Sequence, residues 1–252
     1  LKARIMPVTT ADKSLMVFNP FAVIVTNASS DHFGVDEANL LFDAFKAKAA
    51  GPIVDGRDDA VEVQAGRFVF GGVEFTVPVP GAHNAQNALL AVRMGVLMGF
   101  DPRRLADALG RFKGVERRLQ LVGERNGAKV YDDYAHNPEK LAAAWRTLQA
   151  QAPAGVFGVW RPHGYAPLRK MKDDLALMFA GILRPCDRLM LLPVYDAGGS
   201  AVRDIASDDL LAAISAHGSF PVEVGQPTEA ERLMAEAAAP GRVLAVFGAR
   251  DP

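Results

Sequence analysis

The stretch KVYDDYAHNPEK at residues 129–140 indicates how this chain folds. It begins with a short run at 129–131 that has the β-branched and aromatic character of a strand. Asn137 followed by Pro138 is typical of a helix N-cap and the first helical residue. A strand that leads through a polar loop into a helix predicts an α/β fold. Open α/β sheets bind their ligands at such loops, beyond the carboxyl ends of the strands.

Strand and helix patterns alternate in the same way from about residue 117 to the end of the chain. Further helix starts are predicted at Ser207-Asp208-Asp209 and at Thr228, where Glu231 completes a capping box. The predicted strands are residues 120–123, 129–131, 156–160, 188–192, 222–224 and 243–247. This rhythm favours parallel strands joined by helical crossovers, so we expect residues 117–252 to form a doubly wound, Rossmann-like domain.

The residues before 117 follow a less regular pattern. A strand at 21–26 is followed by a helix at 36–49. Between residues 53 and 79, short alternating runs at 61–63, 68–70 and 73–77 are separated by glycines, which predicts a small antiparallel meander. Two helices that pair with each other are then expected at 85–97 and 103–112, the second opened by Asp101 and Pro102. Residues 1–116 are therefore predicted to form an incomplete α/β domain.

Composition and charge exclude several classes of protein. The chain has 252 residues, of which 50% are hydrophobic and 23% charged, and its net charge is -1. Such a chain buries a substantial core, and it has no basic excess with which to bind a nucleic-acid backbone. A single cysteine, Cys186, cannot form an internal disulfide, and no run of about 18 apolar residues predicts a membrane span. We expect a cytoplasmic protein with neither a nucleic-acid nor a membrane partner.

Several catalytic motifs are absent from the sequence. There is no G-x-G-x-x-G fingerprint after a strand, no C-x-x-C or H-E-x-x-H pair, and no G-x-S-x-G elbow. Nicotinamide chemistry, a structural zinc site and serine hydrolysis are therefore disfavoured. The G-x-x-x-x-G-K-[ST] phosphate loop is also missing from these residues.

Two polar clusters in the first half have both a structural and a ligand-binding interpretation. Residues 26–32, TNASSDH, follow a predicted strand and either satisfy backbone groups or face a ligand. His83 and Asn84 lie at a helix start, where they suit capping as well as binding. Asn87 lies too far into the helix to be its cap, so its amide is expected to face a partner such as a nucleobase edge.

Three clusters in the second half leave similar alternatives. Arg118 and its neighbour before the strand at 120 are either solvated charges or phosphate ligands in a cleft between the domains. Capping explains only two residues of the 131–138 loop, so its other polar side chains suit a ribose or phosphate. The basic segment RPHGYAPLRKMK at 161–172 is either a solvated helix start or an anion site.

Six motifs, in order, resemble the central and C-terminal domains of the Mur ligases, which add amino acids to the UDP-linked muramyl precursor of the bacterial cell wall. These motifs are T-N-x-x-x-D-H, G-x-H-N-x-x-N-A-L-x-A, F-x-G-V-x-R-R, D-D-Y-A-H-N-P, R-P-H-x-Y and V-F-G-A-R-D, between residues 26 and 251. They extend across nearly the whole chain. The resemblance implies that residues 1–116 are part of a P-loop-type central domain and that 117–252 are the C-terminal domain.

The resemblance also implies a reaction and a set of site residues. ATP would phosphorylate the muramyl carboxylate, and the amine of an amino acid would then displace phosphate from the acyl phosphate. By position, His32 resembles the magnesium ligand, while the ATP-binding residues would be His83, Asn84, Asn87, Arg118, Asp132 and Tyr134. His136, His163 and Arg169 would act at the reacting groups. The implied cofactors are ATP and Mg²⁺.

Within the family, the motifs are most similar to the branch that adds L-alanine to UDP-N-acetylmuramate in peptidoglycan precursor synthesis. The alternatives are a ligase that recycles murein tripeptide, a noncatalytic nucleotide-binding module and, ranked last, a folyl- or cyanophycin-type ligase on the same scaffold. Without the phosphate loop, these residues alone are not expected to catalyse. Lys13 stands where the family usually has an acidic residue, through either a gap or a lost metal site.

Overall fold

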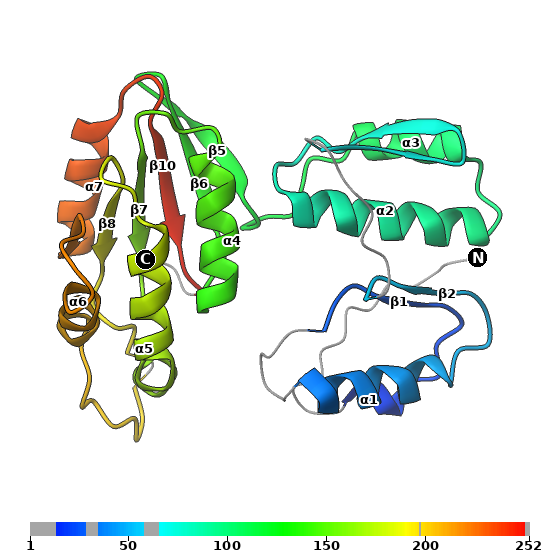
Figure 1. Ribbon diagram of the computed structural model, residues 1–252, viewed down its shortest axis with the longest axis horizontal. Helices are drawn as coiled ribbons and strands as arrows, with labels where there is room; N and C mark the ends of the chain where they lie inside the picture. The colour runs from blue at the N-terminus through cyan, green and yellow to red at the C-terminus, as the bar shows by residue number, and fades with distance from the viewer. Residues whose placement is uncertain (1–13, 29–34, 58–65, 197, 250–252) are drawn as a thin grey trace. The chain divides into compact units, whose positions relative to one another are not determined.

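The computed structural model describes residues 14–28, 35–57, 66–196 and 198–249 (Figure 1). The chain divides into two compact units, residues 1–113 and 114–252. The division lies close to the boundary near residue 116 that the sequence predicts. None of the helices in the described ranges is both long and apolar enough to cross a membrane.

The second unit is built on a six-stranded sheet with the order β5-β6-β10-β7-β8-β9. Its elements are β5 (Gln120–Arg125), β6 (Ala128–Asp133), α4 (Pro138–Gln149), β7 (Val156–Trp160), α5 (Tyr165–Ile182), β8 (Arg188–Leu191), α6 (Ser207–Ser215), β9 (Val222–Val224), α7 (Pro227–Ala237) and β10 (Val243–Phe247). Each strand predicted in this half of the sequence is present, and the predicted α/β class is confirmed.

Helices cover both faces of this sheet because the chain reverses its direction of travel once. From β6 to β9 the parallel strands advance toward one edge, and α4, α5 and α6 share a core that includes Leu141, Phe179 and Leu210. The chain then returns from β9 to β10, between β6 and β7, and α7 packs on the opposite face around Ala230 (Figure 1). Right-handed crossovers in opposite directions place their helices on opposite faces, so the doubly wound arrangement follows from the strand order.

Two local predictions for the second unit are wrong. Strand β5 is antiparallel to β6, because the Asn126-Gly127 turn between them has the positive φ values, 49° and 80°, of a tight hairpin. Helix α7 has no side-chain cap at Gln226, and Pro227 occupies its first turn in place of the predicted Thr228 capping box. The cap at Asn137 is confirmed, since its Oδ1 accepts a hydrogen bond from Lys140 N at 2.9 Å.

The first unit contains two small sheets. The parallel pair joins β1 (Val23–Val25) to β2 (Ile53–Asp55), and the antiparallel hairpin joins β3 (Arg67–Phe70) to β4 (Val73–Thr76). The remaining elements are a 3-10 turn η1 (Ser14–Val17), α1 (Val35–Lys46), α2 (Ala82–Leu97) and α3 (Pro102–Gly110). Part of the predicted meander is confirmed as the β3–β4 hairpin. Residues 53–55, by contrast, pair with β1 outside it, and residues 61–63 lie outside the described ranges.

The two helices after the hairpin pack together with it. Leu89 of α2 shares a core with Phe68 and Phe75 of the hairpin, and Leu105 of α3 packs against that core. The predicted helix pair and the start of α3 are therefore confirmed. Asp101 caps α3 by accepting hydrogen bonds from the backbone N–H groups of Arg103 and Arg104 at 2.8 and 3.2 Å.

Candidate functional site

The loops after β6 and β7 meet at the carboxyl edge of the six-stranded sheet. These strands are not neighbours, since β10 lies between them and is parallel to both. The imidazole of His136, after β6, lies 5.1 Å from that of His163, after β7, measured between ring centroids. The Tyr134 ring is 5.5 Å from that of His136. We call Tyr134, His136 and His163 the carboxyl-edge cluster.

The cluster is able to bind an anion or transfer a proton. His136 and His163 are half-buried, so they remain accessible from solvent. His136 Nδ1 is 3.0 Å from the carbonyl oxygen of Tyr134. When Nδ1 carries the hydrogen, it donates to this carbonyl, and Nε2 is then the nitrogen that accepts a proton from a ligand. Two imidazoles from separate loops therefore lie together at the edge of the sheet where open α/β sheets bind ligands.

Arg118 and Asp132 belong to the same edge of the sheet but have different surroundings. Arg118 is exposed, and within the described parts of the chain its guanidinium has no hydrogen bond or ion pair. It is therefore available to an anionic ligand. The Asp132 carboxylate is half-exposed and lies 3.4 Å from Nε of Arg117, so its predicted ribose contact would be made beside an existing ion pair.

Arg169 is already engaged by the protein. It forms an ion pair with Asp204 and donates to the carbonyl of Val202 at 3.3 Å. A second pair in the same loop joins Arg203 to Asp196 at 2.6 Å. The Arg169 contacts hold the loop between β8 and α6 against α5, and the Arg203–Asp196 pair joins two parts of that loop. The catalytic role of Arg169 remains a prediction. The contacts of Arg169 with Asp204 and Val202 are structural, because they join α5 to the loop.

The predicted adenine-binding residues lie in the first unit, on α2. Asn84 Nδ2 donates to the carbonyl of Pro80 at 2.6 Å, so this amide stabilises the helix start. Asn87 is exposed, and no side-chain hydrogen bond is found for it among the residues described. Its amide is thus available to a base. His83 is also exposed, and it lies against Gly81, which has a φ of 105°.

The predicted metal ligand His32 lies outside the described residues, as does Lys13. Within the ranges described, no group of three or more His, Cys, Asp or Glu side chains is placed to hold a metal ion. The assignment of the α2 residues and the second-unit residues to one ATP site stays a prediction.

One charged cluster in the first unit was not predicted from the sequence. Arg57 makes two hydrogen bonds to the Asp55 carboxylate, at 2.9 and 2.6 Å, and one to Asp43 of α1 at 2.7 Å. The hydrogen bonds from Arg57 hold the pKa of Asp55 far below its usual value, although burial opposes this. This cluster fixes α1 to the carboxyl end of β2, and it has a structural role.

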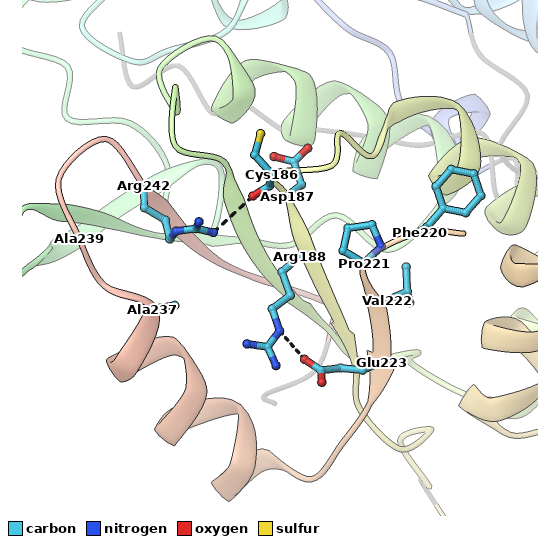
Figure 2. Close-up of a pocket in the computed structure, with 10 residues that line it drawn as sticks. All are labelled: Cys186, Asp187, Arg188, Phe220, Pro221, Val222, Glu223, Ala237, Ala239 and Arg242. Carbon is cyan, nitrogen blue, oxygen red and sulfur yellow. Dashed lines mark hydrogen bonds and ion pairs between the residues drawn. The ribbon is translucent and has the colours of Figure 1, made fainter. Parts of the chain in front are cut away.

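A cavity of about 550 Å³ lies at the opposite, amino edge of the six-stranded sheet (Figure 2). Its wall includes Arg188 at the start of β8, which donates to Glu223 at 2.6 Å and lies 4.9 Å from the Phe157 ring centroid. Arg242, before β10, contacts the Cys186 carbonyl at 3.5 Å. Because it lies at the amino ends of the strands, this cavity is separate from the carboxyl-edge cluster.

Known proteins match this chain in sequence and in fold. The family described as Mur ligase, glutamate ligase domain, matches residues 117–250. A UDP-N-acetylmuramate–L-alanine ligase from Methylocella silvestris is 34% identical over 174 residues, which are 69% of this chain and 36% of that protein. The chain thus spans little more than a third of this relative's length.

Two solved structures have the same fold. The UDP-N-acetylmuramate-alanine ligase of Thermotoga maritima has a TM-score of 0.72 at 19% identity, covering 96% of this chain and 59% of that one. Mycobacterium tuberculosis folylpolyglutamate synthase, solved with ADP, has a TM-score of 0.61 at 17% identity, covering 93% and 64%. At these identities the likeness establishes the fold alone.

Proposed function

Because this chain belongs to the Mur ligase family, whose glutamate ligase domain matches residues 117–250, we propose that the protein is an ATP-dependent ligase that joins L-alanine to UDP-N-acetylmuramate. The 34% identical relative carries the name of this activity. In this proposal residues 1–116 are part of the ATP-binding domain and residues 117–252 are the C-terminal domain. The reaction would take place in the cytoplasm.

The proposed reaction has two steps that balance without an enzyme nucleophile. A carboxylate oxygen of the muramyl substrate attacks the γ-phosphorus of ATP, and the bond to the β,γ-bridging oxygen breaks to release ADP. The alanine amine then attacks the carbonyl carbon of the acyl phosphate, and inorganic phosphate leaves. Both steps require neutralisation of phosphate charge and alignment of the reacting groups.

The described residues supply groups suited to those needs. The exposed guanidinium of Arg118 is planar, and its parallel N–H donors are able to bind two oxygens of one phosphate. The His136 and His163 imidazoles are able to hold a phosphate oxygen or to accept the proton that the amine loses. The observation that carries the proposal is this pair of imidazoles, 5.1 Å apart in the domain that matches the family.

ATP is supported as a substrate by the folylpolyglutamate synthase of the same fold, which was solved with ADP. The proposal includes Mg²⁺ because His32, in the 26–32 segment, resembles the family's magnesium ligand. The exposed amide of Asn87 supports the adenine assignment. The tripeptide-recycling ligase and the noncatalytic nucleotide-binding module stay as alternatives.

A phosphate-release assay on the full-length protein tests the proposal. UDP-N-acetylmuramate and ATP are supplied with L-alanine, glycine, L-serine or no amino acid. A separate reaction contains UDP-N-acetylmuramate, ATP and murein tripeptide. We expect release that depends on L-alanine. Release that occurs in the tripeptide reaction and not with any single amino acid would instead identify the recycling ligase. ATP binding without release in any mixture would identify a noncatalytic module.

Asn87→Ala is expected to weaken binding of ATP without lowering the stability of the protein, because the side chain is exposed. A hydrogen bond contributes about 0.5–1.5 kcal/mol, so the dissociation constant should rise about 2- to 10-fold. Isothermal titration calorimetry on the full-length protein measures this change. The melting temperature of Asn87→Ala is compared with that of Asn84→Ala. The Asn84→Ala variant should melt at a lower temperature because it loses the hydrogen bond to the Pro80 carbonyl. Unchanged ATP affinity in Asn87→Ala would remove the adenine assignment.

A further inference from the structure

Two strained residues flank Arg118. Arg117 and Leu119 have φ values of 56° and 45°, in the left-handed region that favours glycine. This conformation costs roughly 1–2 kcal/mol per residue, and it is rare for a bulky side chain such as leucine. Such strain persists only where the surrounding structure enforces it, and it is concentrated at binding and catalytic sites. The contacts that enforce it here are on both sides of Arg118.

Asp133 holds the segment on the Leu119 side. Its buried carboxylate accepts a hydrogen bond from the Leu119 backbone N–H at 2.6 Å, through Oδ2. Its other oxygen accepts from the Ala135 N–H at 2.7 Å. One carboxylate at the end of β6 therefore joins residue 119 to the loop that supplies His136. The Leu119 side chain is buried in the main core of the unit, which also fixes this position.

Arg117 holds the segment on the other side. Its Nη2 donates to the carbonyl of Gly248, directly after β10, at 2.7 Å. The guanidinium lies 5.3 Å from the Tyr134 ring centroid, and the Arg117 carbonyl accepts from the Tyr134 N–H at 2.7 Å. The ion pair with Asp132 adds a further contact. Arg117 is thus bound to the ends of both β6 and β10.

Arg118 is held differently from its neighbours. Its backbone N–H donates to the Val115 carbonyl at 3.2 Å, whereas its side chain is exposed. The backbone on both sides is fixed, and the guanidinium has no partner in the described parts of the chain. A cation on a fixed backbone loses less conformational freedom when it binds an anion than a cation on a flexible loop.

We propose that Arg117 and Asp133 are positioning residues that hold the strained segment 117–119 so that Arg118 is presented to the phosphate being transferred. This inference rests on the proposed function. It assigns different roles to two adjacent arginines: Arg118 contacts the ligand, and Arg117 acts only through Arg118. A purely structural Arg117 would instead affect the stability of the domain and would be independent of Arg118.

A double-mutant cycle in the full-length protein tests this inference. Arg117→Ala, Arg118→Ala and the double variant are compared by kcat/KM for ATP in the phosphate-release assay, and their melting temperatures are measured. We expect Arg117→Ala to lower kcat/KM about 10- to 100-fold, the range that a small misplacement of a catalytic group produces. We expect the double variant to be no worse than Arg118→Ala alone, because Arg117 has nothing to position once Arg118 is gone.

Three outcomes would overturn the inference. If the effects of the two single variants multiply in the double variant, Arg117 acts independently of Arg118. If Arg117→Ala leaves kcat/KM unchanged while Arg118→Ala lowers it, the proposed function stands and the positioning role is lost. If Arg118→Ala has no effect, the phosphate assignment fails as well. Should Arg117→Ala not fold, Arg117→Lys retains the charge but loses the planar guanidinium, and the same pattern is expected.

Discussion

Arg118→Ala is expected to lower kcat for phosphate release by about 10²- to 10³-fold, the loss that follows removal of one donor to a developing negative charge. In the proposed reaction, the guanidinium neutralises phosphate charge most strongly as the γ-phosphoryl group is transferred. The interaction is therefore worth more in the transition state than in the ground state, and kcat falls along with kcat/KM. The expected loss is a property of the transition state, and ATP binding should change less.

The protein should stay folded in this variant, because the Arg118 side chain is exposed and the contacts of the strained segment are made by its neighbours. Arg125→Ala is a matched control. Arg125 is also exposed and lies at the far end of β5, so its loss should change neither kcat nor the melting temperature. Equal kcat values for the wild type and Arg118→Ala would show that this guanidinium does not contact the reacting phosphate.

The second unit could be predicted from sequence because its local signals agree with one another. The strand at 156–160 is a continuous buried run, as expected for the interior of a parallel sheet, and Asn137 and Pro138 mark a helix start that the structure confirms. The error at β5 had a visible signal. Asn126-Gly127 is a preferred hairpin turn, and it indicates an antiparallel pair within an otherwise parallel pattern.

The first unit was harder to predict because strand pairing is not encoded locally. Residues 53–55 have the same short apolar pattern as the hairpin strands, yet they pair in parallel with residues 23–25 across α1. The intervening helix is the signal for such a parallel pair, since parallel strands require a crossover connection. A pattern of alternating residues identifies a strand without identifying its partner.

Sequence patterns identified candidate residues for the site but not the contacts that hold them. His136 and His163 are 27 residues apart in the chain. Their approach to 5.1 Å depends on β10, which begins 80 residues after His163 and lies between their strands. Arg117 and Arg118 have the same side chain, and only tertiary structure distinguishes the bound guanidinium from the exposed one. The run of two arginines is a local signal for a binding segment. It does not show which of the two arginines would bind the ligand and which would position the other.

Asp187→Ala is expected to destabilise the second unit by about 1–3 kcal/mol, the cost of leaving buried hydrogen-bond donors without their acceptor. The Asp187 side chain is fully buried, and it accepts hydrogen bonds from Arg184 Nη2 at 2.9 Å, Gln149 Nε2 at 2.7 Å and the Val156 N–H at 2.8 Å. These contacts join α4, the turn before β8 and the first residue of β7. Alanine would leave the backbone N–H groups of Val156 and Arg184, Gln149 Nε2 and Trp145 Nε1 without this acceptor, and the partly exposed Arg184 guanidinium without its ion-pair partner.

This contribution should depend on pH in a defined direction. Burial tends to raise the pKa of Asp187, but the hydrogen bonds from Arg184 and Val156 outweigh it, and the pKa is lowered from its ordinary value of 3.8. Between the lowered folded value and the unfolded value, the unfolded chain binds more protons. The stabilisation is therefore complete above about pH 5 and is lost as the pH falls through the folded pKa.

Urea unfolding of the 252-residue chain, followed by tryptophan fluorescence, measures both effects, since its two tryptophans, Trp145 and Trp160, are buried in this unit. The gap in unfolding free energy between wild type and Asp187→Ala should be largest near pH 7 and should shrink below pH 4. Asp174→Ala, which removes an exposed carboxylate from α5, should change stability by no more than about 0.5 kcal/mol. If Asp187→Ala lowers the free energy of unfolding by less than about 1 kcal/mol, the surrounding donors find other acceptors. The prediction that the Asp187 carboxylate holds these three segments together would then be wrong.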